Sequence, residues 1–297
     1  MKSAPFDYYR ARTVDEVCRV LAESDGEARI IAGGQSLVPL MATRLARPDR
    51  LVDINAVDEL DGIARDGDAL VIGAMTRQRT AERDPLVAAH CPLLARALCH
   101  VGHVQTRNRG TVGGSLCQAD PAAEIPLAAV TLEATLHLAS RRGPRRVAAG
   151  DFATAALTTV CADDECLTAV SFPVWTETAV GCAFHEVSMR HGDFAMVAAA
   201  AQLALDADGR CRRLRLGLGG VAATAVAIPA VADALVGTGL TEADIAAAVP
   251  AIDQGIDPDD DVHASAGYRR RVARRLAARA IADAADEARA RLEAGPP

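Results

Sequence analysis

Aromatic residues are scarce in this chain: one Trp, three Tyr and five Phe make up only 3% of its 297 residues. Long apolar runs are also missing, because no stretch reaches the roughly 18 uncharged apolar residues typical of a membrane-spanning helix. The opening residues, Met1 to Pro5, lack the apolar run of a signal peptide. Positive charge is not in excess either, since 32 Lys and Arg stand against 39 Asp and Glu, for a net charge of -7. These absences predict a soluble protein with no membrane span, and they disfavour nucleic acid as its main partner.

Paired cysteines are absent as well, although cysteine itself is present. The eight cysteines form no CxxC pair and are scattered at Cys18, Cys91, Cys99, Cys117, Cys161, Cys166, Cys182 and Cys211. A secreted disulfide framework is denser and belongs to shorter chains, so the pattern predicts a reducing, cytoplasmic setting. The composition, 50% hydrophobic and 24% charged, is typical of a globular protein with one large domain or two to three smaller ones.

The N-terminal part of the chain has the pattern of a small βαβ-like unit. Thr13 and Glu16 form a Thr-x-x-Glu arrangement ahead of apolar residues at helical spacing, which predicts a capped amphipathic helix. The expected elements are a helix at 13–24, a strand at 28–32, a helix at 40–45 and a strand at 50–54. Gly33 and Gly34 follow the first strand, so they lie at a strand-to-helix turn.

Farther along, strand and helix patterns alternate irregularly. We expect strands at 69–73, 132–138, 166–172, 182–189, 195–205 and 212–218, and helices at 92–101 and 264–292. A polar break at 174–178 predicts the main domain boundary, with one domain over 1–175 (subdomains about 1–56 and 57–175) and a second over 176–290. The irregular alternation favours an α+β fold over a doubly wound sheet.

Two glycine turns are the candidate binding elements. The first, Ala32-Gly-Gly-Gln-Ser-Leu37, follows the Ile30-Ile31 strand. Glycines permit unusual backbone conformations and remove side chains that would keep a phosphate from the main chain, and successive N–H groups can form an anion-binding concavity. A plain strand-to-helix turn is the commoner explanation of this segment taken alone. The second turn, Gly110-Thr-Val-Gly-Gly-Ser115, again ends in two glycines and a hydroxyl, and together the two turns could bind the two phosphates of a dinucleotide.

With these motifs in hand, the chain resembles the FAD-binding medium subunits of molybdenum hydroxylases, the carbon monoxide dehydrogenase and xanthine dehydrogenase group. The matching segments, in family order, are 29–41 (RIIAGGQSLVPLM), 50–54 (RLVDI), 105–115 (QTRNRGTVGGS), 119–124 (ADPAAE), 190–195 (RHGDFA) and 264–269 (ASAGYR). The resemblance covers about residues 5 to 280. It implies a FAD-binding fold of the p-cresol methylhydroxylase and vanillyl-alcohol oxidase type, with two α+β subdomains, followed by a C-terminal α/β domain of the carbon monoxide dehydrogenase flavoprotein type.

The resemblance also implies which residues bind the cofactor. The pyrophosphate would be bound by Ala32, Gly33, Gly34, Gln35, Ser36 and Leu37 with Thr111, Val112, Gly113, Gly114 and Ser115. Glu124 falls where the family has a carboxylate on the FAD, Val101 and Leu167 align with apolar positions on either side of the isoalloxazine, and Phe184 and His185 align with positions beside it. The family usually has Asn at Ser115 and often His at Gln35; both residues here remain polar. No inserted iron–sulfur loop is present.

The function implied is electron transfer. The molybdenum cofactor would lie in a large partner subunit and the [2Fe-2S] clusters in a small one, within a dimer of heterotrimers, and this FAD would pass the electrons to an external acceptor. No catalytic acid–base pair and no metal site is expected in this chain. Two alternatives stay open: a free-standing flavin-dependent oxidase or dehydrogenase, and a non-catalytic scaffold that has lost FAD.

Three other sequence patterns could indicate a function: a Rossmann-like glycine motif, a metal-like cluster and a run of arginines. Gly217 to Ala222 contains G-x-G-x-x-A, but Pro229 interrupts the helix that a Rossmann site requires, so a turn in the C-terminal domain is the better interpretation. A cluster at 90–103 resembles a metal site, but buried thiols and a hydrogen-bonded histidine explain it more simply. The arginines at 269–275 indicate a solvated face, contacts with acidic neighbours or a partner surface.

Overall fold

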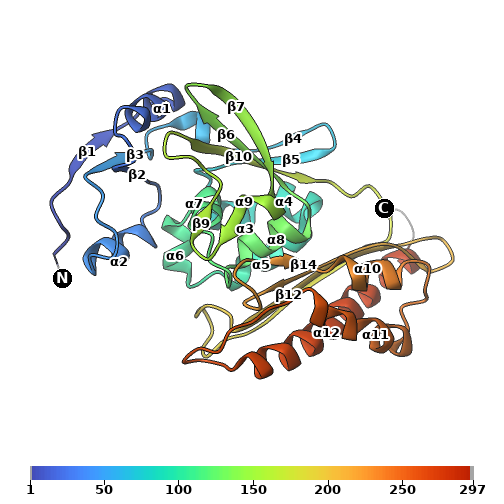
Figure 1. Ribbon diagram of the computed structural model, residues 1–297. Helices are drawn as coiled ribbons and strands as arrows, with labels where there is room; N and C mark the ends of the chain where they lie inside the picture. The colour runs from blue at the N-terminus through green and yellow to red at the C-terminus, as the bar shows by residue number, and fades with distance from the viewer. Residues whose placement is uncertain (1, 295–297) are drawn as a thin grey trace.

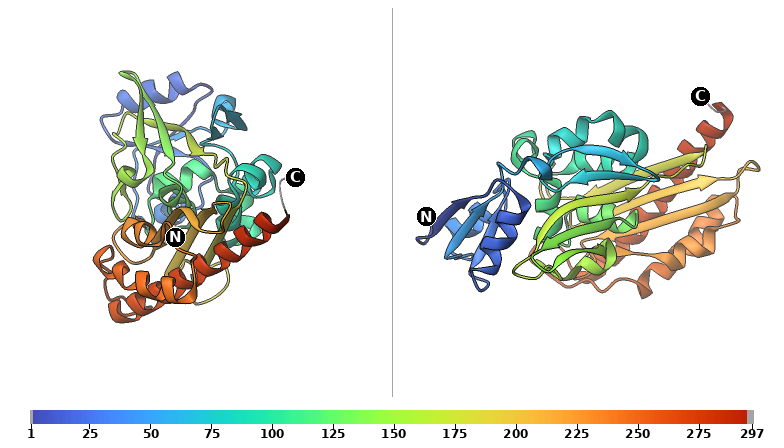
Figure 2. Two further views of the ribbon diagram at one scale, coloured as in Figure 1. Left: turned by 90° about the vertical axis from the view of Figure 1, so that its right-hand side faces the viewer. Right: turned by 90° about the horizontal axis from the view of Figure 1, so that it is seen from above.

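The computed structural model describes residues 2–294 and contains three main sheets and a two-stranded hairpin, with helices packed on the main sheets (Figure 1). The first is a parallel sheet of β1 (Asp7–Arg10), β3 (Arg50–Asp53) and β2 (Ala28–Ile31), with α1 (Val14–Ala22) and α2 (Leu37–Ala42) in its connections. In Figure 2 this unit projects from the rest of the molecule at the N-terminal end. The predicted βαβ-like unit is therefore confirmed, with β1 as an additional edge strand.

Helix α1 begins where the sequence predicts it. The Thr13 hydroxyl accepts a hydrogen bond from the Glu16 N–H (3.2 Å), and the Glu16 carboxylate accepts one from the Arg12 N–H (2.8 Å). These bonds occupy N–H groups that have no partner within the helix. The buried face of α1, which includes Val17 and Leu21, packs into a small core with Val52 of β3.

The second sheet is antiparallel, in the order β4-β5-β10-β6-β7. Its strands are β4 (Ile63–Asp66), β5 (Ala69–Gly73), β10 (Cys166–Pro173), β6 (Thr135–Ser140) and β7 (Gly143–Ala148). The strand predicted at 132–138 starts later, because a preceding helix continues to Thr131 and the backbone at Glu133 is left-handed (φ 56°). Strand β7 was not predicted, since its sequence GPRRVA has no apolar alternation.

Helices fill the space between this sheet and the C-terminal sheet. They are α3 (Gln78–Arg83), α4 (Pro85–His90), α5 (Pro92–His100), α6 (Val104–Arg109), α7 (Val112–Gln118), α8 (Glu124–Thr131) and α9 (Ala149–Phe152). Near them are the short 3-10 turn η1 (Asp58–Leu60) and the small hairpin β8 (Ala153–Ala155) with β9 (Thr158–Thr159). Helix α5 was predicted, whereas α6 and α7 were not, because their polar or glycine-rich sequences carry no apolar periodicity.

The third sheet is antiparallel and has helices on both faces. It contains β11 (Val180–Val187), β12 (Val197–Leu205), β13 (Cys211–Gly219) and β14 (Val226–Ala227), followed by α10 (Pro229–Leu235), α11 (Glu242–Ala248), η2 (Val249–Gln254) and α12 (Ala266–Ala294). Helices α5 and α8 pack on one face, and α12 crosses the other (Figure 1). All nine residues of β12 are buried, which explains its sequence VAAAAQLAL, in which Gln202 is the one polar residue.

Helix α12 is held close to the sheet by small residues, and ion pairs connect its start to the segment at 253–261. A Cβ on Gly181 would lie 1.9 Å from the Ala284 carbonyl oxygen, so only glycine fits this contact. The arginines at its start contact acidic neighbours, as one of the predicted alternatives stated. The pairs are Arg269 with Asp261 (2.6 Å), Arg270 with Asp257 (3.6 Å) and Arg274 with Asp253. No helix begins at Gly217 to Ala222, which instead passes into a turn and β14, so the Rossmann interpretation is excluded.

Candidate functional site

The two glycine turns meet main chain to main chain. A Cβ added to Gly33 would lie 2.1 Å from the Arg109 carbonyl oxygen and 2.9 Å from Gly110 Cα. Glycine at position 33 is therefore needed for the close approach of the two turns. The sequence predicted that both turns serve one site, and the structure does bring them together.

The first turn offers unused main-chain donors. The N–H groups of Gly33, Gly34, Gln35 and Ser36 donate no hydrogen bond to any described residue, and the Ser36 hydroxyl has no described partner either. Gly34 has a positive φ of 71°, a conformation that glycine adopts without strain. Successive N–H groups of this kind attract an anion. The predicted anion-binding turn at 32–37 therefore has the donors that its role requires.

The second turn differs, because its N–H groups already donate hydrogen bonds to acceptors within the protein. Val112 N–H donates to the Thr76 carbonyl (3.0 Å), Gly113 N–H to the Ala74 carbonyl (2.9 Å) and Gly114 N–H to the Thr111 hydroxyl (3.0 Å). The missing Gly113 side chain makes room for Ala74, whose Cβ would lie 2.6 Å from an added Cβ. A ligand could therefore contact the exposed backbone of Gly114 and the Ser115 hydroxyl, which has no described partner.

An arginine that the sequence did not indicate connects the two turns. Arg77 donates to the Arg109 carbonyl and, over 2.7 Å, to the Asn55 side-chain oxygen. The Asn55 amide in turn donates to the Ala32 carbonyl (2.9 Å). Partial burial lowers the pKa of Arg77, and the nearby Arg109 charge acts in the same direction. This chain of hydrogen bonds fixes the spacing of the turns, and only the three-dimensional contact could have revealed it.

A second part of the site is apolar. Val101 (8% exposed), Leu167 (4%) and Phe184 (6%) all belong to the hydrophobic cluster between the second and third sheets. The carbonyls of Val101 and its neighbour Gly102 both accept hydrogen bonds from the buried Arg107 guanidinium, at 2.8 and 3.1 Å. The three residues predicted to flank a flavin ring thus lie in one apolar region.

The predicted carboxylate, Glu124, begins helix α8 and is only 4% exposed. It receives no hydrogen bond from another described residue. Burial raises the pKa of Glu124 to about 7, and the Glu186 carboxylate acts in the same direction while His100 opposes it. A buried carboxylate without a partner is costly and often marks a functional position.

His185 lies on the other face of its strand from Phe184, because side chains alternate along β11. Its Nε2 is 2.7 Å from an Asp283 carboxylate oxygen on α12. The His185 side chain therefore lies on the opposite face of the sheet from a flavin that would pack beside Phe184.

The metal-like cluster at 90–103 is dispersed in space. Cys91 is buried, and burial raises the pKa of its thiol, whereas Cys99 is exposed. His100 pairs with Glu186, and His103 packs against His191 with ring centroids 6.4 Å apart. Across residues 2–294, no three His, Cys, Asp or Glu side chains are arranged to hold a metal ion.

The loop at 188–196 contains side chains that the sequence analysis did not assign to the site. Phe194 and Met189 are 62% and 66% exposed, which is unusual for large apolar residues. The loop lies against the turn before α6, since a Cβ on Gly192 would be 2.6 Å from the His103 ring. The family landmark at 190–195 was the signal that could have indicated Phe194.

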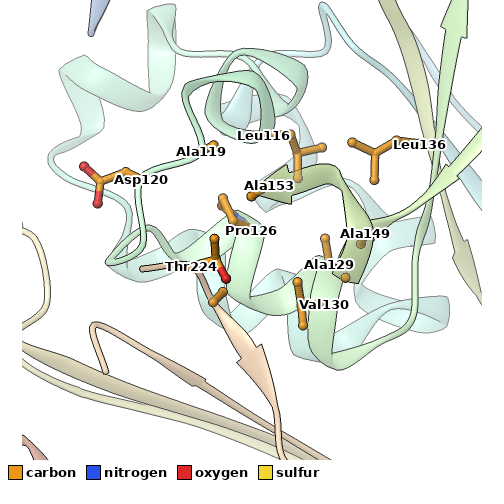
Figure 3. A pocket seen from close by; sticks show the side chains of 12 residues that line it. Leu116, Ala119, Asp120, Pro126, Ala129, Val130, Leu136, Ala149, Ala153 and Thr224 are labelled. Carbon is orange, nitrogen blue, oxygen red and sulfur yellow. The ribbon is translucent and has the colours of Figure 1, made fainter. Parts of the chain in front are cut away.

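A small cavity lies nearby but is too small for a cofactor. Its volume is about 20 Å³, and its lining combines α7 and α8 residues such as Leu116 and Pro126 with Thr224 of the turn between β13 and β14 (Figure 3). Asp120 is the only charged residue in its lining. Such a space holds about one water molecule, so the glycine turns and the apolar region define the candidate site. In the part of the chain that the structure describes, no helix is both long enough and apolar enough to cross a membrane.

Comparison with known proteins shows which family the chain is similar to. Residues 4–175 match the family described as FAD binding domain in molybdopterin dehydrogenase, and residues 182–284 match the CO dehydrogenase flavoprotein C-terminal domain. The chain is 39% identical to the 6-hydroxypseudooxynicotine dehydrogenase complex subunit alpha of Paenarthrobacter nicotinovorans, over 97% of each chain. It is 34% identical to the carbon monoxide dehydrogenase medium chain of Afipia carboxidovorans, over 93% of this chain and 95% of that protein. Among solved structures it is similar to quinoline 2-oxidoreductase from Pseudomonas putida 86, with 40% identity, a TM-score of 0.92 and coverage of 97% and 99%.

Proposed function

This chain belongs to the family of FAD-binding medium subunits of molybdenum hydroxylases, and from this premise we propose that it is the electron-transfer flavoprotein subunit of a heteromeric hydroxylase. Electrons would arrive from a small [2Fe-2S] subunit, after substrate oxidation at the molybdenum cofactor of a large subunit, and leave for an external acceptor. When bound, FAD supplies the chemistry, because it accepts electrons from one partner and yields them to another. The name of the P. nicotinovorans relative refers to a complex, which supports the proposal that this chain works in an assembly. We further propose a dimer of heterotrimers.

The observation that carries the proposal is the pair of glycine turns. Among residues 2–294, the four N–H groups from Gly33 to Ser36 have no hydrogen-bond partner, and the second turn beside them ends in the Ser115 hydroxyl, which has no described partner either. We propose that the first turn binds the pyrophosphate through main-chain donors and that the second contributes Ser115 and the open side of Gly114. The assignment extends to the full predicted sets at 32–37 and 111–115.

The apolar region supports the position of the flavin ring. Val101, Leu167 and Phe184 would flank the isoalloxazine, and Glu124 would provide a carboxylate to the FAD. The proposal that His185 lies next to the ring is supported by the family resemblance and not by the geometry. We also propose the division into residues 1–175 and 176–290, which is supported by the short connection between β10 and β11.

The protein supplies binding and electrostatics but no catalytic acid–base pair in this assignment. The role of its residues is to hold the cofactor, to exclude water from one side of the ring through Val101 and Phe184, and to leave an edge accessible. The cytoplasmic location stays a prediction.

The proposal is tested by purifying the tagged chain from its native host and identifying the subunits and cofactors that co-purify with it. We expect one complex that contains FAD, iron and molybdenum. An iron-free single chain with full oxidase activity would support the free-standing flavin oxidase instead. A chain that stays colourless after incubation with FAD would support the scaffold alternative and refute the proposal.

A further inference from the structure

Two titratable side chains that have no role in the proposed function meet beside the apolar region. His100 ends α5, and Glu186 lies on β11 two residues beyond Phe184, on the same face of the strand. His100 Nδ1 is 3.2 Å from Glu186 Oε1, and the His100 and Phe184 rings pack with centroids 5.1 Å apart. His100 also directly precedes Val101. The pair therefore adjoins two of the residues that we assign to the flavin ring.

The carboxylates of Glu186 and Glu124 accept few hydrogen bonds. The Glu186 side chain is 5% exposed, and its Oε2 is buried with no hydrogen-bond partner among the described residues. Glu124, on the opposing helix α8, is 4% exposed and likewise receives no hydrogen bond from another described residue. Burial disfavours ionised carboxylates that lack partners. His100 thus contacts the Glu186 carboxylate directly, and the charge of Glu124 on α8 also acts on His100.

The surroundings displace the pKa values of two of these groups, Glu124 and His100. Burial raises the pKa of Glu124 to about 7. The hydrogen bond with Glu186 raises the pKa of His100, and the Glu124 charge acts in the same direction, whereas burial opposes them. A change of charge nearby therefore alters the number of protons that these groups hold.

Other charged groups on the surrounding elements already have partners, and β12 contributes no charged side chain. These groups are Arg96, paired with Glu287 of α12 (2.8 Å), Arg107, paired with Glu82 of α3 (2.8 Å), and Asp120, which accepts the Ala122 N–H (2.9 Å). His185 faces α12 on the other side of β11. The groups free to respond are therefore His100, Glu186 and Glu124.

We propose that His100, held by Glu186 and coupled to Glu124, is a proton-accepting site that takes up one solvent proton when two electrons reach the bound FAD. This inference rests on the proposed function, because it requires FAD beside Val101 and Phe184. The electrons come from the iron–sulfur subunit, or from an electrode in the test. The flavin takes from solvent the proton that its own two-electron reduction requires, in wild type and variant alike; the further solvent proton stays on the imidazole or carboxylate, and no bond forms between the chain and the cofactor. Negative charge that arrives in a buried site raises the proton affinity of its neighbours.

The test measures the two-electron midpoint potential of FAD bound to the full chain, by spectroelectrochemistry between about pH 6 and about pH 9. Each coupled proton changes the equilibrium tenfold per pH unit, which is about 30 mV per pH unit for a two-electron couple. We expect the His100→Gln variant to show a slope shallower than the wild-type slope by up to about 30 mV per pH unit. His137→Gln removes instead a partly buried histidine of β6 that hydrogen-bonds Ser171 (2.5 Å) and has no assigned role in the site, and it keeps the wild-type slope. Equal slopes in His100→Gln and wild type would overturn the inference.

A second measurement needs no variant that could misfold. In wild-type chain with ¹³C-labelled histidine and bound FAD, the His100 ring is titrated by NMR in the oxidised and the dithionite-reduced forms. Linkage requires its titration midpoint to rise on reduction, by about one pH unit for a tenfold gain in proton affinity. An unchanged midpoint would refute the role of His100 while leaving the proposed function intact. Failure of the wild-type chain to bind FAD, seen first in the visible spectrum, would instead refute the proposed function and with it this inference.

Discussion

Replacing Gly33 with alanine tests how the two glycine turns are held together. The added Cβ would lie 2.1 Å from the Arg109 carbonyl oxygen, 2.8 Å from its carbon and 2.9 Å from Gly110 Cα. All three are main-chain atoms, so no side chain can rotate away. The second turn would have to retreat by about 0.9 Å to bring the nearest contact to 3.0 Å. Expansion of this kind costs about 1–3 kcal/mol.

The same displacement would weaken the cofactor site. Hydrogen bonds to a charged group contribute about 1.5–3 kcal/mol each, so the loss of one lowers FAD affinity by about 10- to 150-fold. The packing cost lowers the melting temperature of the FAD-free chain by about 2–4 °C per kcal/mol, the range for domains of about 150–250 residues. Gly33→Ala is thus expected to lower both quantities together.

The assays are thermal unfolding of the FAD-free chain and titration of FAD followed by quenching of flavin fluorescence. Gly150→Ala is the matched control, because a Cβ at Gly150 on α9 meets no atom within 4 Å. It should keep the wild-type FAD affinity and leave stability unchanged or raise it by about 0.4–1 kcal/mol. Wild-type stability and affinity in Gly33→Ala would refute the reasoning that the turns are in main-chain contact.

Three further predictions concern the same region. The wild type is expected to lose up to about 3 kcal/mol of stability as the pH rises from about 4.5 to about 7, because the pKa of Glu124 is higher in the folded state and the unfolded state releases the proton first. Glu124→Gln should remove this loss. Urea unfolding that gives the same change of stability with pH for both proteins would contradict this. Gly114→Val should abolish FAD binding while the chain stays folded, because an added Cβ meets only the Thr111 side chain within 4 Å; retained flavin in the purified variant would show that the second turn does not face the phosphates. Arg107→Leu removes the donor to the Val101 carbonyl and one partner of a mostly buried ion pair, which should lower the free energy of unfolding by about 3 kcal/mol, and an unchanged denaturant midpoint would argue against it.

The sequence predicted those parts of the fold whose apolar pattern or capping is local. Helix α1 follows from Thr13 and Glu16, and β12 follows from its apolar run, because burial on both faces requires one. Helices α6 and α7 were not predicted, because their sequences, VQTRNR and VGGSLCQ, have no apolar periodicity and the helices are stabilised by tertiary contacts. For α7 these contacts include hydrogen bonds from its first N–H groups to carbonyls near β5.

The candidate site likewise has features that the sequence predicts and features that only tertiary contacts reveal. The glycines of both turns are visible in the sequence, but their separate roles are not. Gly33 and Gly113 serve contacts with the main chain or Cβ of distant residues, whereas Gly34 serves a positive φ. Arg77 and the His100–Glu186 pair connect elements far apart in the chain, so no spacing rule could have indicated them.

The central claim, that this chain is a FAD-binding subunit, is tested most directly by adding FAD to the purified wild-type chain and removing the excess by gel filtration. The account predicts a protein peak with flavin absorbance at a ratio near one FAD per chain, from which Gly114→Val elutes without flavin. A wild-type peak that carries no flavin would contradict the account.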